Sequence, residues 1–166
     1  MGAGPAGLSA ALTGRIRNKS VALFEHLDFS QKLQKAPAVD NYLGIPAVTG
    51  KGLIQQFSAH ALAHKPTLLQ EKVTDIFPGD DFLTVLTPEN SYEAKTVILT
   101  TGVFDTPLFE GEQKFLGRGV GYCATCDGRM FADKDVAVIS YTNEGESEAG
   151  FLSEICRSVY YLPQYK

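Results

Sequence analysis

The chain has 166 residues, of which 44% are hydrophobic and 20% charged, a balance that allows a core and excludes a disordered, collagen-like or small disulfide-stapled protein. The formal net charge of −4 argues against nucleic acid as the main partner, and no apolar run approaches a membrane span in length. The chain opens without a secretory signal pattern and has three cysteines. We therefore expect a cytoplasmic protein, in which a close cysteine pair is redox-active or binds a metal.

The first residues form the pattern G-x-G-x-x-G, made of Gly2, Ala3, Gly4, Pro5, Ala6 and Gly7. In a dinucleotide fold these glycines allow a tight turn, a close approach of the backbone to a pyrophosphate, and close packing of helix on strand. A helical pattern follows over residues 4–17, and its N-terminal N–H groups would face the diphosphate. Alone, the pattern fits a glycine-rich turn equally well, since only Met1 stands where a strand should precede it.

The next predicted strand, residues 21–25, supports the dinucleotide interpretation. It ends in Glu25, which follows Gly7 by 18 residues and stands where an acid hydrogen-bonds a ribose hydroxyl. Residues 27–48 contain prolines and no clear period, so we expect a long connection there. A helix is predicted from residue 49 or 50 to about 64, with apolar residues at helical spacing.

Short apolar runs separated by turn residues then predict strands. The expected strands are 67–69, 73–77, 82–87 and 92–95. The last three read as a small antiparallel meander. Residues 97–99 are expected to return as a buried strand that runs into Thr100, Thr101 and Gly102. A second β-α-β pattern follows, with a strand over 136–139, a helix over 144–157 and a strand over 159–162.

The most chemically specific segment is Cys123-Ala124-Thr125-Cys126-Asp127. Two cysteines at this spacing can cycle between dithiol and disulfide, and a nearby helix N-terminus or cation favours the reactive thiolate. Asp127 adds a carboxylate that can give or take a proton at a departing thiolate. A zinc site is the alternative, but it needs two more ligands, and Cys156 and the scattered histidines lack ligand spacing. A structural disulfide is the other alternative.

These motifs together resemble the low-molecular-weight thioredoxin reductases. The matching segments are residues 2–7, 40–44, 100–102 and 117–128. The resemblance implies an α/β fold: a Rossmann-like, three-layer FAD-binding domain with a small meander over 1–112, and the start of a second Rossmann-like, NAD(P)-binding-like domain that carries the cysteines over 113–166.

The resemblance also implies roles for single residues. It implies that FAD binds non-covalently, with Glu25 near the ribose, Asn41 near the flavin, and Gly2, Gly4, Pro5, Ala6, Gly7, Thr101 and Gly102 as further cofactor-binding residues. It implies that Cys126 faces the flavin, that Cys123 exchanges with thioredoxin, and that Asp127 is the acid/base. No metal is expected.

The second β-α-β pattern departs from this family where NADPH should bind. Ser140 and Thr142 occupy two positions that are small in the fingerprint, Tyr141 between them is bulky, and acidic residues begin the helix. The strand that follows lacks a basic cluster for a 2′-phosphate. The chain therefore resembles the ferredoxin-dependent flavin thioredoxin reductases, which implies reduced ferredoxin as the electron donor. Arg118, Arg129 and Lys134 are candidates for a basic patch that receives an acidic donor.

Three alternatives stay open: an NADPH-dependent thioredoxin reductase, a related flavin disulfide reductase, and a non-catalytic binding module of the same fold. Because the family returns to its FAD domain after the inserted second domain, we expect the complete protein to be about twice this length. On this hypothesis the chain is truncated at both ends, binds FAD poorly alone and exposes apolar sheet edge. The full-length protein is expected to be a homodimer.

Overall fold

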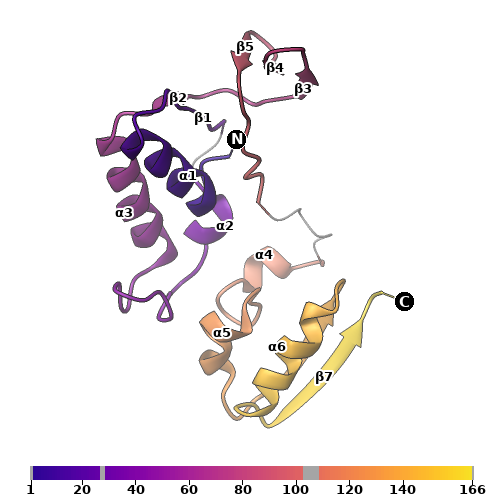
Figure 1. Cartoon of the computed structure of the whole chain (residues 1–166). Coiled ribbons are helices and arrows are strands. Elements are labelled where there is room, and N and C mark those ends of the chain that lie inside the picture. The colour runs from indigo at the N-terminus through magenta and orange to yellow at the C-terminus, as the bar shows by residue number, and fades with distance from the viewer. Residues whose placement is uncertain (1, 27–28, 103–108, 166) are drawn as a thin grey trace. The chain divides into compact units, whose positions relative to one another are not determined.

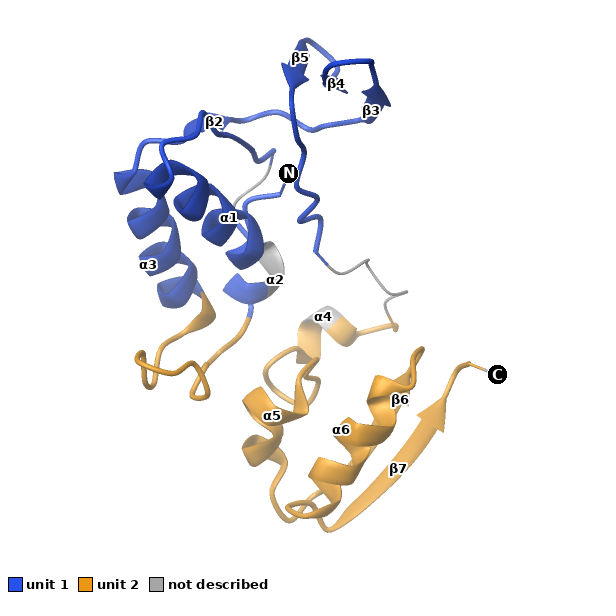
Figure 2. Ribbon diagram, viewed as in Figure 1, with its two compact units in different colours: residues 1–35, 51–105 blue, residues 36–50, 106–166 orange. Residues whose placement is uncertain are grey.

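The computed structural model describes residues 2–26, 29–102 and 109–165. The chain divides into two compact units, shown in two colours in Figure 2. Unit 1 comprises residues 1–35 and 51–105, and unit 2 comprises residues 36–50 and 106–166. Within the described ranges, no helix is both long enough and apolar enough to cross a membrane.

Unit 1 is built on a short parallel sheet, with helices before its first strand and between its two strands (Figure 1). Its elements are α1 (Pro5–Ile16), β1 (Ala22–Phe24), α2 (Gln31–Gln34), α3 (Gly50–Ala63), β2 (Thr67–Leu69), β3 (Asp75–Pro78), β4 (Leu83–Leu86) and β5 (Ser91–Ala94). β1 pairs with β2 in parallel, with Leu23 opposite Leu68. The buried core joins α1, β1 and α3 through Leu8, Leu23 and Ile54.

The start of α1 shows why this segment is helical. Gly4 is the N-cap, with extended backbone, and Pro5 occupies the first turn, where its fixed φ suits a helix and its missing N–H costs nothing. Leu8 and Ala11 then follow on the buried face, at 2% exposure each. The helix ends before Asn18, whose φ of 56° lies in the left-handed region that asparagine tolerates.

The three strands β3, β4 and β5 form an antiparallel meander. Val85 in the central strand pairs with Ile76 on one side and Tyr92 on the other, and it is 2% exposed. The ring of Tyr92 also meets Phe24 of β1 edge to face, with centroids 5.3 Å apart. The meander is therefore tied to the parallel sheet of the same unit.

Unit 2 contains the cysteine segment and a second β-α-β arrangement. Its elements are α4 (Glu112–Phe115), α5 (Ala124–Asp127), the 3-10 helix η1 (Gly128–Phe131), β6 (Asp135–Ser140), α6 (Glu144–Ser153) and β7 (Ser158–Pro163). β6 and β7 pair in parallel, and Ala149 and Leu152 of α6 are buried. The guanidinium of Arg157 binds the Asp135 carboxylate with two nitrogens, which joins the starts of both strands.

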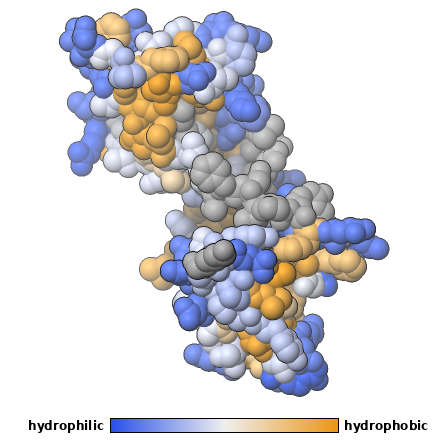
Figure 3. Space-filling model, turned by 90° about the vertical axis from the view of Figure 1, so that its right-hand side faces the viewer, coloured by the Kyte–Doolittle hydropathy of each residue, from blue (hydrophilic) through white to orange (hydrophobic). Residues whose placement is uncertain are grey.

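One face of the β6–β7 sheet is open. Ile139 pairs with Leu162 across the two strands, and these side chains are 41% and 46% exposed. Tyr160, two residues before Leu162 and so on the same face, is exposed as well. Hydrophobic residues, drawn in orange, also gather in patches on the face of the chain that Figure 3 turns to the viewer.

Most expected elements are confirmed, with ends that differ by a few residues. The expected buried strand at 97–99 is wrong: the described structure has no strand there, and Ile98 and Leu99 are 60% and 63% exposed. An apolar run becomes a buried strand only where sheet neighbours and covering helices enclose it. The long connection contains an unexpected short helix, α2, and a bridge between Val39 and Val48. The helix expected to reach residue 157 ends at Ser153.

Candidate functional site

The glycine fingerprint is closely packed at its first and last glycines. Gly2 has a φ of +96°, and a Cβ there would overlap the carbonyl oxygen of Thr100. A Cβ on Gly7 would overlap the carbonyl oxygen of Gly2. The Thr100 hydroxyl donates a hydrogen bond of 2.9 Å to that same oxygen. Both glycines are therefore required by the packing of the turn against residues 100–101.

Gly4 differs from these two, because the protein leaves room beside it. A Cβ there would meet only the Ser30 side chain, at the ordinary contact distance of 3.8 Å. As the N-cap of α1, Gly4 stands where the first N–H groups of the helix point outward. This open backbone at a helix N-terminus fits a diphosphate, so the residues present fit the FAD expected from the sequence.

Glu25 lies at the carboxyl end of β1, next to the fingerprint. Its Oε2 accepts a hydrogen bond from the Ala3 N–H at 3.1 Å, and its Oε1 accepts one from the His26 N–H at 2.9 Å. A carboxylate at the carboxyl end of a strand in this fold can reach a ribose hydroxyl. The structure thus brings Glu25 and the fingerprint together.

The other expected cofactor residues lie in different surroundings. Thr101 is exposed, and its Cα would lie 3.6 Å from a Cβ on Gly2. Gly102 has a φ of +78°, and nothing lies within 4 Å of a Cβ built there. Asn41 is exposed and belongs to unit 2, between the two residues of the Val39–Val48 bridge. The roles of all three with a cofactor stay predictions.

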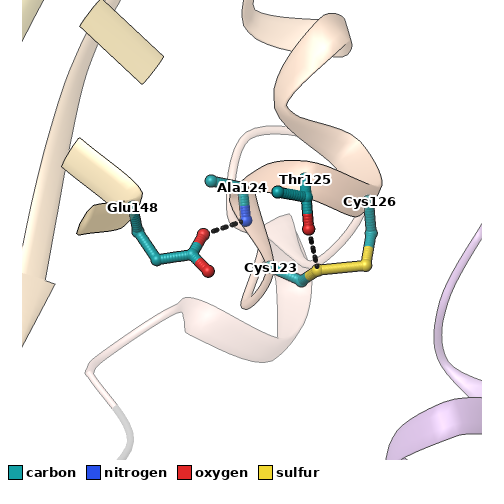
Figure 4. The surroundings of a disulfide bond; sticks show 5 residues. All are labelled: Cys123, Ala124, Thr125, Cys126 and Glu148. Carbon is teal, nitrogen blue, oxygen red and sulfur yellow. Dashed lines mark hydrogen bonds between the residues drawn. A yellow bond between two sulfur atoms is a disulfide. The ribbon is translucent and has the colours of Figure 1, made fainter. Parts of the chain in front are cut away.

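Cys123 and Cys126 form a disulfide across the single turn of α5, with their Cα atoms 5.3 Å apart (Figure 4). Cys123 is the N-cap of this helix, and its carbonyl oxygen accepts hydrogen bonds from the N–H groups of Cys126 and Asp127. The Thr125 hydroxyl lies 3.4 Å from the Cys123 sulfur, and it is the donor because a disulfide sulfur carries no proton. Both cysteines are half-buried, so burial does not distinguish them.

Asp127 is half-buried directly after the pair. Burial raises the pKa of its carboxyl group, a backbone hydrogen bond opposes this, and the charge of Glu148 raises the pKa further. A Cβ on Gly121 would overlap the Asp127 carboxylate, so the absence of a side chain at Gly121 leaves the space that this carboxylate occupies. A carboxyl group whose pKa is raised keeps its proton to higher pH, which suits a proton donor to a thiolate.

Three residues near the cysteines were missed by the sequence analysis. Glu148 accepts a hydrogen bond of 2.6 Å from the Ala124 N–H (Figure 4). Tyr122, directly before Cys123, donates its hydroxyl to Glu112, which also accepts the Phe109 N–H at 2.8 Å. The hydrogen bond from Tyr122 is the main cause that lowers the pKa of Glu112. No local spacing signals the contacts of Glu148 with Ala124 and of Tyr122 with Glu112, because their partners are 24 and 10 residues apart in the chain.

The turn after β6 is filled by its own side chains. The Ser140 hydroxyl donates to the Thr142 carbonyl oxygen at 2.6 Å and accepts the Thr142 N–H at 3.3 Å. A Cβ on Gly145 would overlap the side chain of Ser140, so this glycine allows α6 to approach β6. Nearby, the Tyr165 hydroxyl lies 2.7 Å from that of Tyr161, and this hydrogen bond is the main cause that raises the pKa of Tyr161 to about 12.

A Rossmann-like unit with a glycine fingerprint, followed by a unit with a cysteine pair, is the combination found in nucleotide-dependent disulfide oxidoreductases. A profile of the family described as pyridine nucleotide-disulphide oxidoreductase matches residues 1–161, and the chain belongs to this family.

Individual relatives make the similarity more specific. The thioredoxin reductase of Mycoplasma genitalium is 34% identical over 164 residues, which are 98% of this chain and 52% of that protein. A crystal structure of a ferredoxin-flavin thioredoxin reductase from Clostridium acetobutylicum is 44% identical with a TM-score of 0.61, over 99% of this chain and 57% of that one. A thioredoxin reductase structure from Streptococcus pyogenes is 31% identical with a TM-score of 0.86, over 99% and 56%.

These comparisons confirm the resemblance to the thioredoxin reductases and the α/β, Rossmann-like fold class. The chain spans about half the length of these relatives.

Proposed function

We propose that this chain is the FAD-binding and disulfide-carrying part of a flavin-dependent thioredoxin reductase whose electron donor is reduced ferredoxin. On this proposal residues 1–112 belong to the FAD domain, and residues 113–166 belong to a domain of the NAD(P)-binding type. The full-length enzyme would act as a homodimer on thioredoxin.

The turn after β6 is the observation that carries the choice of donor. In a nucleotide-binding turn, the backbone must lie open for a diphosphate to approach. Here the Ser140 side chain lies in the turn and hydrogen-bonds to Thr142, and Glu144 and Glu146 bring negative charge to the first turn of α6. This arrangement disfavours a dinucleotide, because the charge opposes phosphate at the positive end of the helix. The similarity to the ferredoxin-flavin thioredoxin reductase of Clostridium acetobutylicum supports the same choice.

FAD would be held at Gly4, beside the N–H groups that begin α1, with Glu25 toward its ribose. When bound, it supplies the electron pair that opens the Cys123–Cys126 disulfide. Opening this bond with two electrons and two protons yields two thiols. Asp127 would protonate a departing thiolate, a role that the raised pKa of its carboxyl group supports.

The cysteines then carry out thiol–disulfide exchange. The Cys123 thiol loses its proton and attacks the thioredoxin disulfide as a thiolate, so a mixed disulfide forms, and the thioredoxin thiolate that leaves takes up a proton. Cys126 next attacks the mixed disulfide at the Cys123 sulfur. This step re-forms the Cys123–Cys126 disulfide and releases the second thioredoxin thiol, which balances the two electrons.

The electron donor is tested on the full-length reductase by stopped-flow absorbance of its flavin. Mixing with reduced ferredoxin should bleach the flavin, whereas mixing with NADPH should leave it oxidised on the same timescale. Fast bleaching by NADPH would overturn the choice of donor, and purified protein without flavin would favour a binding module.

The roles of the cysteines are tested with a matched pair of variants. Cys126→Ser should trap thioredoxin as a stable mixed disulfide on Cys123, because the resolving thiol is absent. Cys123→Ser should trap none. Mass spectrometry of the non-reduced complexes reads this out, and trapping by Cys123→Ser alone would reverse the two roles.

A further inference from the structure

A carboxylate from a different helix occupies the N-terminus of the cysteine helix. Glu148 lies on α6, and its Oε2 accepts the N–H of Ala124, the first residue of α5, at 2.6 Å. Because Ala124 directly follows Cys123, this hydrogen bond fixes the carboxylate beside the disulfide (Figure 4). Glu148 is half-buried, so water and salt screen its charge less than at an exposed position.

The packing of the unit holds Glu148 in this place. Gly128 ends the turn of α5 and is buried, and a Cβ there would lie 3.1 Å from the Leu152 side chain and 3.3 Å from that of Ile155. The absence of a side chain at Gly128 therefore lets α6 lie close to the cysteine turn. Glu148 is one turn before Leu152 on α6, so its reach to Ala124 follows from this close packing.

Two polar groups act on Cys123 in opposite directions. A cysteine at a helix N-terminus ordinarily ionises more easily, because the N–H groups and the helix dipole stabilise its thiolate. The hydroxyl of Thr125, 3.4 Å from the Cys123 sulfur, acts in the same direction. The Glu148 carboxylate opposes both, because it takes up the first N–H of the helix and brings a negative charge.

Other charged groups lie on the elements around α5. Glu144 and Glu146 are exposed on α6, and Arg129 is exposed on η1. Asp127 lies within α5 itself, and Glu148 contributes to raising the pKa of Asp127, after burial. Glu112 and the hydroxyl of Tyr122 are hydrogen-bonded to each other on the segment before the cysteines.

We propose that Glu148 is a positioning residue of the cysteine pair, which holds the first turn of α5 and disfavours ionisation of the Cys123 thiol. The reduced pair then gains less stability from ionisation of Cys123. The equilibrium between dithiol and disulfide therefore lies further toward the disulfide, which makes the pair a stronger reductant. This inference rests on the proposed function in one respect, namely that the pair cycles between dithiol and disulfide.

The test uses the full chain and needs neither flavin nor an electron donor. Glu148→Gln keeps an amide oxygen that can accept the Ala124 N–H but removes the charge, and Glu144→Gln makes the same change at an exposed position of the same helix. Two quantities are measured: the pH dependence of Cys123 alkylation by iodoacetamide, followed by mass spectrometry, and the equilibrium of the pair with a glutathione redox buffer.

Glu148→Gln should move the alkylation midpoint to lower pH and speed alkylation at neutral pH by about threefold or more, since half a pH unit changes the thiolate fraction by about that factor. At a pH above the alkylation midpoints of both chains, where the added stability of the thiolate enters the equilibrium in full, the glutathione equilibrium should shift toward the reduced pair by a comparable factor. Glu144→Gln should stay close to the parent in both. A pair that cycles but responds equally to the two variants, or to neither, would overturn the role of Glu148. A pair that does not cycle in the parent chain would overturn the proposed function itself.

Discussion

Single residues around Asp127 show how the site combines stability and chemistry. Burial raises the pKa of this carboxyl group, and Gly121 leaves space for it. An acid whose pKa is higher in the folded chain than in the unfolded chain contributes stability at low pH, and this contribution is lost as the pH rises through the folded pKa. Above its folded pKa, where Asp127 is ionised, its burial therefore destabilises the fold, as is common for functional groups.

We expect Asp127→Asn to be more stable than the parent at neutral pH, with the difference disappearing near pH 3. Thermal unfolding of both chains at the two pH values measures this. In the full-length reductase the same change should slow thioredoxin reduction by about 100-fold, the size typical of a lost general acid. Equal stability at neutral pH would show that the burial of Asp127 costs nothing.

Gly121→Ala tests the same carboxylate without changing its chemistry. The added Cβ would overlap the end of the Asp127 side chain, which can swing away at little cost because it is flexible. We expect thioredoxin reduction to slow in the same direction as for Asp127→Asn, while the thermal unfolding midpoint changes little. Unchanged turnover would show that thioredoxin reduction does not depend on the position that the Asp127 carboxylate has in this structure.

At the level of elements, the glycine turn before α1 contains two different constraints. Gly7 is required by packing, because a Cβ would overlap a backbone oxygen, whereas Gly4 has room for one. Gly7→Ala should therefore destabilise the fold by about 2 kcal/mol or more. Gly4→Ala should leave stability nearly unchanged and weaken FAD binding in the full-length protein. Urea unfolding and flavin content measure the two effects, and normal flavin content in Gly4→Ala would contradict the assignment.

The carboxylate of Glu71 joins three polar side chains of the β4–β5 hairpin. Glu71 accepts hydrogen bonds from the Thr87 and Tyr92 hydroxyls, each at 2.6 Å, and from the Asn90 amide at 3.2 Å. These hydrogen bonds lower the pKa of Glu71, and the one from Thr87 has the largest effect. The ionised Glu71 therefore contributes stability at a pH above its unfolded pKa, and this contribution is lost as the pH falls through its folded pKa.

Glu71→Gln should consequently lower the thermal unfolding midpoint at neutral pH, and the difference from the parent should shrink in acid once the pH has fallen through the lowered folded pKa of Glu71, because the parent then also loses this charge. Glu93→Gln, at an exposed position of β5, is the matched control and should have little effect at either pH. A midpoint for Glu71→Gln that differs equally from the parent at both pH values would contradict this account.

The elements also show which features the sequence can predict. Periodic apolar residues predicted α1 and α3, and turn residues predicted the meander, because these signals are local. Residues 97–99 were misjudged, since their apolar character says nothing about which neighbours cover them. Glu148 and Gly121 were missed for the same reason: each acts on the cysteine helix through tertiary contacts. The disulfide pair itself was predictable from its spacing.

For the whole molecule, the net charge of −4 bears on the proposed donor. We expect the ferredoxin to be acidic, so the overall field of this chain would repel it, and productive encounter would depend on local cations. Arg118, Arg129 and Lys134, all exposed in unit 2, are the candidates.

Arg118→Glu and Arg129→Glu in the full-length reductase should each slow flavin reduction by ferredoxin by about threefold or more at low salt, and the effect should shrink at high salt. Lys19→Glu makes the same charge change on an exposed residue of unit 1 and should have a smaller effect. Stopped-flow rates across an ionic-strength series measure this, and equal slowing by all three variants would point to net charge alone.

The turn after β6 has a consequence for how such units can change in evolution. The glycine at position 145 lets α6 lie close to β6, while the hydroxyl of Ser140 bonds to the backbone of Thr142. On the proposed function, the shape of the unit and its choice of ligand therefore rest on different positions of one short motif. Substitutions at positions 140 and 142 can alter what the turn binds while the scaffold around it persists, so a search for the intact fingerprint would overlook units of this kind.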